Sequence, residues 1–170
     1  MQNRKRITVK EDATVHLPPP SAYVQTVDTN PVGNFSSYVS NEQKRKLETV
    51  VACIVLEAGG EGRQGMEAVN EVIHNRAAAQ NKSLFDVVIA PKQFSCFNHG
   101  IDHAISLARR HAKWGEALRI VSSPKTNHTM GAVYYHTRSI RPSWSEKLLD
   151  KGYETLTIGH HVFYYKDRQY

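Results

Sequence analysis

Residues 54–76 read IVLEAGGEGRQGMEAVNEVIHNR, and this stretch decides the fold because a helical apolar stripe stops inside it. Two acids, Glu57 and Glu61, stand on either side of a pair of glycines, and four of the seven residues 59–65 are glycine. Glycine this dense ends a helix and lets the backbone approach a ligand closely. The stretch therefore predicts two helices joined by a tight glycine turn, with a carboxylate at the junction.

The segments on both sides of the glycine turn have the periodicity of amphipathic helices. Ser40 is followed three residues later by Gln43, which predicts a capping box at the start of the first helix. The apolar stripe of that helix recurs at spacings of three and four: Leu47, Val50, Val51, Ile54 and Val55. A second helix, over about residues 65–79, places four apolar residues on one face: Met66, Val69, Val72 and Ile73.

Two more helices are expected before residue 120. Ser83 and Asp86 predict a capped short helix in SLFDVVIA, which Pro91 ends. A further helix is expected from about residue 102 to residue 118. Its inward face would carry three residues: Ile105, Ala108 and Ala112.

The last third of the chain changes to strand-forming residues. β-Branched and aromatic residues concentrate in GAVYYHT (131–137) and in ETLTI and HVFYYK (154–166), which predicts two or three short strands. The predicted fold class is therefore mostly α, an α+β arrangement with a small antiparallel β element near the C-terminus. At 170 residues and 40% hydrophobic content, the chain suffices for one compact core.

Residues 1–40 differ in composition from the rest of the chain. They begin with basic residues and continue through a proline triplet and an Asn-Pro, Gly and Ser-rich stretch without periodicity. Such sequences favour extended polyproline II conformation over a packed core. We therefore expect an extended N-terminal arm or linker over 1–40 and one folded domain over 41–170.

The charge balance narrows the classes of partner. Lys and Arg number 22 against 16 Asp and Glu, a net charge of +6, which favours polyanions such as nucleic acid, anionic membranes or acidic wall polymers. No nucleic-acid fold signature accompanies the basic face around residues 109–119, so a solvated helix side is the simpler account.

No apolar run of 18 residues occurs, and the N-terminus lacks the apolar centre of a signal peptide. We expect neither nucleic acid, nor a membrane span, nor an export signal.

The cysteines and histidines do not form a recognisable cofactor or metal motif. Cys53 lies in an apolar run and reads as a small buried thiol, whereas Cys96 lies in a loop beside aromatic residues. His99 and His103 have ligand-like spacing, but no H-E-x-x-H motif and no third ligand accompany them. The sequence therefore predicts no metal and no cofactor.

The two acids at the glycine turn are the candidates for proton chemistry. Glu57 follows Ile54 by three residues, so it continues the apolar stripe into the last turn of the first helix. Apolar neighbours and the partial negative charge of a helix C-terminus both raise a carboxyl pKa, as a general acid working near neutral pH requires. The alternative interpretation is that Glu57 is a surface glutamate at a helix end with no catalytic role.

Glu61 leaves three interpretations open. With Glu57 it could form a pair of glycosidase carboxylates, whose separation would distinguish retention from inversion. It could instead cap the second helix, or accept backbone N–H groups within the glycine turn. Sequence spacing does not choose among these.

Four blocks of sequence, in order, resemble the SleB-type cell wall hydrolases. The first resembles the family's E-A-x-G-E core with its following glycine, A-V pair and N-R pair: Glu57, Ala58, Gly60, Glu61, Gly65, Ala68, Val69, Asn75 and Arg76. The second resembles its Q-F-S element: Gln93, Phe94 and Ser95. The third resembles its G-A-x-Y-Y and P-x-W elements: Gly131, Ala132, Tyr134, Tyr135, Pro142 and Trp144. The last resembles its closing I-G-x-H-x-F-Y: Ile158, Gly159, His161, Phe163 and Tyr164.

The resemblance covers about residues 44–165 and departs at one position of the first core. Gly59 stands where the family often has arginine, which should loosen the turn or remove a contact. The resemblance implies a lysozyme-like helical fold, peptidoglycan as substrate and cleavage of the β-1,4 bond between N-acetylmuramic acid and N-acetylglucosamine. It also implies that Glu57 is the catalytic acid of a lytic transglycosylase, in which the substrate's own C6 hydroxyl is the nucleophile.

A glycan groove needs aromatic faces interleaved with short polar side chains, because sugar rings have apolar faces ringed by hydroxyls. Within the resembling blocks, the expected substrate-binding residues besides Glu61 are Gln93, Ser95, Tyr134, Tyr135, His136 and Trp144. Gln93 and Tyr135 are the two favoured contacts. Phe94 and Phe163 are expected in the core instead.

Other functions remain compatible with the sequence. The fold could serve as a non-catalytic structural or glycan-binding component of a phage particle, with the arm contacting other virion proteins. The enzyme could be a hydrolytic muramidase, or an N-acetylmuramoyl-L-alanine amidase. The expected locations are a phage virion, or the host cytoplasm before lysis, with action on the cell wall.

Overall fold

The structure is a computed structural model that describes residues 40–166, so the predicted arm over 1–40 lies outside the described residues except for Ser40. The helical segments are, in chain order, α1 (Asn41–Ala58), η3 (Gly59–Glu61), α2 (Gly62–Gln80), α3 (Leu84–Val88), η4 (Ser95–Phe97), α4 (Ile101–Arg109), α5 (Trp114–Val121) and α6 (Ser143–Asp150). The strands are β1 (Tyr134–Thr137), β2 (Glu154–Ile158) and β3 (His161–Tyr165). The predicted class, mostly helical with a small antiparallel sheet near the C-terminus, is confirmed.

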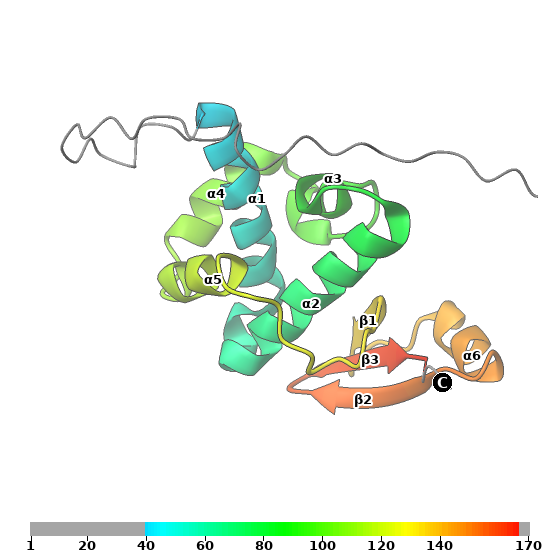
Figure 1. Ribbon diagram of the computed structural model, residues 1–170. Coiled ribbons are helices and arrows are strands. Elements are labelled where there is room, and N and C mark those ends of the chain that lie inside the picture. The colour runs from blue at the N-terminus through cyan, green and yellow to red at the C-terminus, as the bar shows by residue number, and fades with distance from the viewer. Residues whose placement is uncertain (1–39, 167–170) are drawn as a thin grey trace, which may run out of the picture. The chain divides into compact units, whose positions relative to one another are not determined.

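Helix α1 is the centre of the helical part and packs against α2, α3, α4 and α5 (Figure 1). The predicted capping box begins it: the Ser40 hydroxyl accepts from the Gln43 N–H at 3.1 Å, and the Gln43 side chain accepts from the Ser40 N–H at 3.0 Å. Its second half is buried on nearly every side, and Val51 and Ile54 are fully inaccessible. Because α1 ends inside the core, its last turn has a fixed position.

The glycine turn between α1 and α2 is a single 3₁₀ turn rather than a loop. Gly59 keeps a right-handed helical conformation, and the chain reverses at Gly62, where φ is 72°. A side chain at Gly65 would place its Cβ 2.2 Å from the Cβ of Glu61, so α2 can begin this close to η3 only with glycine there. The glycines thus bring α2 back against α1 within one turn.

The helix predicted over residues 102–118 is wrong as one element, because the chain breaks at residues 110–113 into α4 and α5. Ala108 and Ala117 are both fully buried. Nine residues at about 100° each would put them on opposite sides of a continuous helix, and the break lets α4 and α5 each pack against α1. Ala112, expected to face inward, is exposed in the break.

The predicted strands form a three-stranded antiparallel sheet in the order β1-β3-β2. A small second core lies between α2 and this sheet, formed by Ala68, Val72, Ala132, Ile158 and Phe163. Helix α6 was not predicted. It follows Pro142, buries Ser145 and Leu148, and lies beside the sheet (Figure 1).

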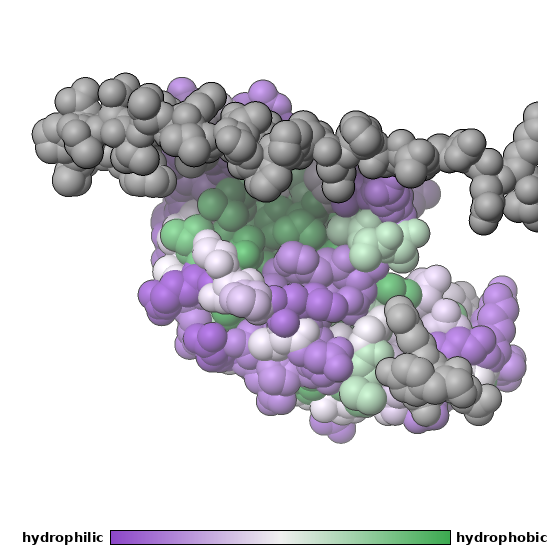
Figure 2. Space-filling view, in the orientation of Figure 1, coloured by the Kyte–Doolittle hydropathy of each residue, from purple (hydrophilic) through white to green (hydrophobic). Residues whose placement is uncertain are grey.

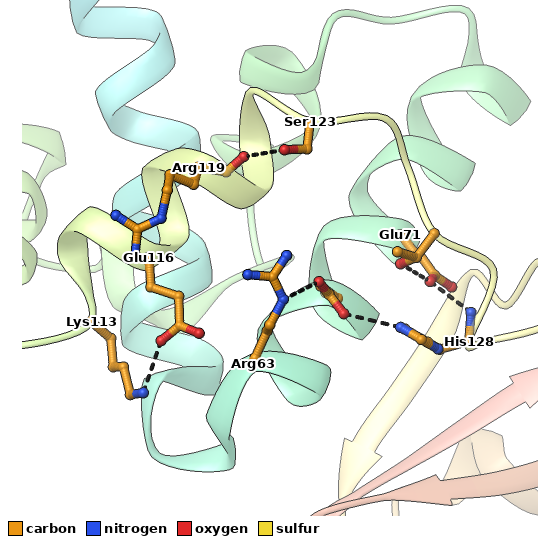
Figure 3. A network of polar contacts seen from close by, with 9 residues as sticks. Arg63, Glu71, Lys113, Glu116, Arg119, Ser123 and His128 are labelled. Atoms are coloured by element: carbon orange, nitrogen blue, oxygen red, sulfur yellow. Dashed lines mark hydrogen bonds and ion pairs between the residues drawn. The ribbon is translucent and has the colours of Figure 1, made fainter.

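A buried carboxylate ties the connection before β1 to α2 (Figure 3). Glu71 is 1% exposed and accepts hydrogen bonds from the backbone N–H groups of His128 and Thr129, each at 2.7 Å, and from the hydroxyls of Thr126 and Thr129. Burial would raise the pKa of this carboxyl, but the hydrogen bonds together hold it below its usual value. Glu67 adds a contact to His128 Nε2 at 3.0 Å.

We expect Glu71→Gln to destabilise the domain by about 2–4 kcal/mol, because an amide N–H₂ would face donors that now bond to a charged acceptor. A carboxyl with a depressed folded pKa stabilises the native state above its unfolded pKa, and this contribution disappears as the pH falls through the folded value. Urea unfolding at neutral and at acid pH measures both effects. The variant should therefore lose less stability on acidification than the wild type.

The matched control is Glu146→Gln on α6, where an exposed carboxyl lies 3.6 Å from Arg141. That variant should stay within about 0.5 kcal/mol of the wild type. An unchanged unfolding midpoint for Glu71→Gln would contradict the role of this carboxylate.

Candidate active site

Glu57 lies in the last turn of α1 with its side chain only partly exposed. The Tyr135 hydroxyl donates to its Oε2 at 3.2 Å, and the Cys96 side chain is a second hydrogen-bonding partner. Burial raises the pKa of the Glu57 carboxyl, while Tyr135, Cys96 and the charge of Arg76 partly offset that rise. The direction agrees with the one predicted from its place on the apolar stripe.

Tyr135 connects α1 to the sheet. Its ring stacks on Phe163 at a centroid distance of 5.4 Å and meets the His161 ring edge-on at 5.1 Å. These contacts come from the neighbouring strand β3, in which Phe163 is paired with Tyr135. The hydroxyl that reaches Glu57 is therefore fixed by strand pairing and ring packing.

Arg76, in the second half of α2, joins several parts of the site. Its Nε donates to the Val133 carbonyl at 2.7 Å and its Nη1 donates to the Gln93 side chain at 3.3 Å. Its guanidinium lies 5.4 Å from the Phe94 ring centroid and 6.0 Å from that of Tyr135. Arg76 thus places a cation beside the site and orients Gln93.

A hollow of about 560 Å³ opens beside Tyr135. Four of the predicted substrate-binding residues line it: Gln93, Tyr134, Tyr135 and Trp144. Arg76, Lys92 and Gln80 add polar groups to its wall. Glu57 is not among the lining residues, and it is connected to this aromatic hollow through its hydrogen bond to the Tyr135 hydroxyl.

Two predicted residues lie near the aromatic hollow without lining it. His136 follows Tyr135 on β1, where its Nε2 lies 2.9 Å from the Tyr164 hydroxyl and its ring meets Trp144 edge-on. Ser95 begins η4 and is exposed. Phe94 and Phe163 are buried core residues, as predicted.

Glu61 is bound to the turn between β2 and β3. It accepts from the His160 backbone N–H at 2.7 Å and lies within 3.2 Å of the His160 Nδ1, and its side chain makes no capping bond to α2. The capping interpretation is therefore wrong, and the backbone N–H that it accepts belongs to this distant turn. The His160 backbone bond is the largest cause of the lowered pKa of Glu61.

Two glycines leave room for Glu61. A Cβ at Gly159 would lie 2.1 Å from the Glu61 Oε2, and one at Gly65 would lie 2.2 Å from the Glu61 Cβ. The two acids of the opening motif therefore occupy opposite environments. Glu57 is biased toward the protonated form and Glu61 toward the anion, which is the separation of roles that an acid and a fixed negative charge require.

Gly59 provides space for another side chain. A Cβ there would lie 2.9 Å from the His111 Cε1, so the imidazole from the break between α4 and α5 fills this space. At this position, where the resembled family often has arginine, the His111 ring packs against the turn.

The other chemistry-bearing residues do not gather into a second centre. Within residues 40–166 no three His, Cys, Asp or Glu side chains come together as ligands of a metal, and His99 and His103 pack ring against ring at 5.7 Å. Cys53 is fully buried, as predicted, and Cys96 is partly buried. In the same range, none of the helices combines the length and apolarity needed to cross a membrane.

The fold and this site define a small helical domain with a partly buried acid, Glu57, next to an aromatic hollow. A family model described as cell wall hydrolase matches residues 60–164. The chain therefore belongs to the cell wall hydrolase family, which confirms the resemblance and supports an enzyme that degrades peptidoglycan. The match begins just after Glu57 and includes Glu61, Gln93, Tyr135 and Trp144. Searches of curated proteins and of solved structures gave no match.

We expect Tyr135→Phe to raise the pKa of Glu57 further, because the lost hydroxyl stabilises the carboxylate form. The acid form would then persist to higher pH. Carboxyl-detected NMR titration of labelled glutamates measures the shift directly. Tyr134→Phe is the control, since Tyr134 contacts Trp144 and Tyr153 through its ring. A Glu57 titration unchanged in Tyr135→Phe would contradict this coupling.

Proposed function

We propose that this domain cleaves the β-1,4 bond between N-acetylmuramic acid and N-acetylglucosamine as a lytic transglycosylase, with Glu57 as its general acid and base. The observation that supports this most is the environment of that carboxyl: a raised pKa and a Tyr135 hydrogen bond beside an aromatic hollow. The other acid of the motif, Glu61, is already bound to His160. These contacts favour Glu57 over Glu61 for proton transfer, and the proposed chemistry needs only one carboxyl.

The proposed reaction uses the same carboxyl twice. Protonated Glu57 gives its proton to the glycosidic oxygen as the bond from that oxygen to C1 of the muramic acid breaks. The resulting carboxylate takes the proton of the C6 hydroxyl of the same muramic acid as its oxygen bonds to C1. The product is a 1,6-anhydro sugar, Glu57 is protonated again, and no water is consumed.

The aromatic hollow supplies surfaces suited to sugar rings. Tyr134 and Trp144 are 40% and 36% exposed, with ring centroids 5.9 Å apart. Exposed aromatic faces can cover the apolar faces of pyranose rings, while Gln93 and Lys92 are placed to meet hydroxyl groups. Arg76 keeps Gln93 oriented through its Nη1.

The alternatives differ in their products. A muramidase would let water attack C1 and give reducing ends. An amidase would release free peptides, and a zinc amidase would also need a ligand set, which residues 40–166 do not assemble. A non-catalytic component of a phage particle would bind glycan without releasing anything. The phage location and the binding role of the arm remain predictions from sequence.

We expect Glu57→Gln to lower cleavage of purified sacculi by at least about a hundredfold, because the amide can neither give nor take the proton. Mass spectrometry of the digest identifies the products, and anhydro-muropeptides are expected from the wild type. Reducing-end muropeptides or free peptides would contradict transglycosylation. Full activity in Glu57→Gln would refute the assignment of the acid, with Glu146→Gln as the matched control and thermal unfolding as the test of fold.

We also expect Trp144→Ala to weaken binding of wall glycan strands by about tenfold, since one exposed aromatic platform contributes about 1 kcal/mol or more. Binding is measured with the Glu57→Gln protein, so that cleavage does not intervene. The control is Leu149→Ala, which removes an exposed apolar side chain from the same helix outside the hollow. Equal binding by both variants would argue against the aromatic hollow as a sugar site.

A further inference from the structure

A second hollow, of about 650 Å³, lies next to the aromatic hollow. Its walls come from α2, from the connection that precedes β1 and from the end of β3. The residues that give it chemical character are Asn75, Lys125, Asn127, Met130, Tyr165 and Lys166. We call it the lysine hollow.

The lining of the lysine hollow is cationic. Lys125 and Lys166 belong to it, no Asp or Glu does, and within residues 40–166 neither lysine forms an ion pair. The Lys125 Nζ donates to the neutral Asn75 side chain at 2.8 Å, and the Lys166 Nζ lies 5.8 Å from the Tyr153 ring centroid. Glu154 contacts the lining through the Tyr165 hydroxyl, which donates to it at 2.7 Å. Among the described residues, no carboxylate therefore neutralises either ammonium group.

The two hollows are neighbours, because Ala79 and Val133 line both. Ala78 and Gly131 extend the small-residue surface on the lysine side. Small side chains at this boundary leave no bulky wall, so one ligand can occupy both hollows. The chain segment before β1 that carries Gly131 and Val133 is held against α2, since the Asn75 Nδ2 donates to the Ala132 carbonyl at 2.9 Å.

We propose that the lysine hollow holds the acidic stem peptide of the glycan strand whose sugars occupy the aromatic hollow. This inference rests on the proposed function, which places muramic acid, the sugar that carries the peptide, next door. Carboxylates of the peptide pair with Lys125 and Lys166, and its amides meet the exposed Asn127. Met130, 52% exposed, contacts its apolar side chains.

The test compares two substrates for the full chain: glycan strands with stem peptides, and the same strands stripped of peptide by an amidase. For the double variant Lys125→Ala/Lys166→Ala, we expect kcat/KM on peptide-bearing strands to fall about tenfold and cleavage of stripped strands to stay unchanged. Lys147→Ala/Lys151→Ala, which changes exposed lysines at the end of α6, is the matched control and should alter neither. Equal losses on both substrates would overturn the inference.

A titration without catalysis separates this inference from the proposed function. Isolated tripeptide stem is added to labelled Glu57→Gln protein, and amide NMR shifts around residues 125–131 and 165–166 are expected, with loss of at least about tenfold in affinity in the double variant. Shifts elsewhere, or equal binding by inorganic phosphate, would overturn it. If the wild type cleaves strands but the double variant behaves like it, the proposed function stands and the peptide site falls.

Discussion

The candidate site depends on one constraint: a carboxyl held partly out of water at the end of a buried helix. Helix α1 packs against four other helices and its second half is buried, so the backbone that carries Glu57 is held in place. The glycine turn then returns the chain at once, which lets α2 and the strand it supports approach the same carboxyl. Gly62 has a φ of 72°, which residues with side chains rarely adopt, and a Cβ at Gly65 would lie 2.2 Å from the Glu61 Cβ, so glycine at both positions lets α2 start close to α1.

The sheet is attached to the helical part through polar side chains of α2 as well as through packing. Glu71, Asn75 and Arg76 bond in turn to the backbone around residues 128–133, just before β1 begins. These bonds hold the connection before β1 in one position. They therefore also position β1, from which the Tyr135 hydroxyl donates to Glu57. The Glu71 carboxylate (Figure 3) and the Arg76 side chain of the site are thus parts of one arrangement, because both come from the second half of α2 and both bond to the connection before β1. Figure 2 shows the corresponding surface pattern, with hydrophobic residues gathered around α1 and hydrophilic ones over α2.

Local signals predicted those elements whose causes are local. The Ser40 capping box, the apolar stripe of α1 and the strand-forming runs depend on neighbouring residues, and all three agree with the structure. The break between α4 and α5 was not predicted. Residues 108 and 117 would lie on opposite sides of a continuous helix, but the structure was needed to show that both are buried. Within the candidate site, the sequence singled out Glu57, whose role stays a prediction, and four residues that line the aromatic hollow. It missed the roles of Arg76, Cys96 and the Glu61–His160 pair, because these join residues 17 to 99 positions apart.

The contrast between the two acids also explains why a symmetric carboxylate pair is a poor description of this chain. A pair that shares one reaction needs both carboxyls free to face the bond being broken. Here the Glu61 oxygens are occupied by the His160 backbone and ring, and that bond is possible because residue 159 is glycine. The same hydrogen bond attaches the β2–β3 turn to the start of α2, so the Glu61 carboxylate has a structural role. Glu57, whose carboxylate form is disfavoured by burial, is the acid of the motif whose pKa is shifted upward, the direction that a general acid requires.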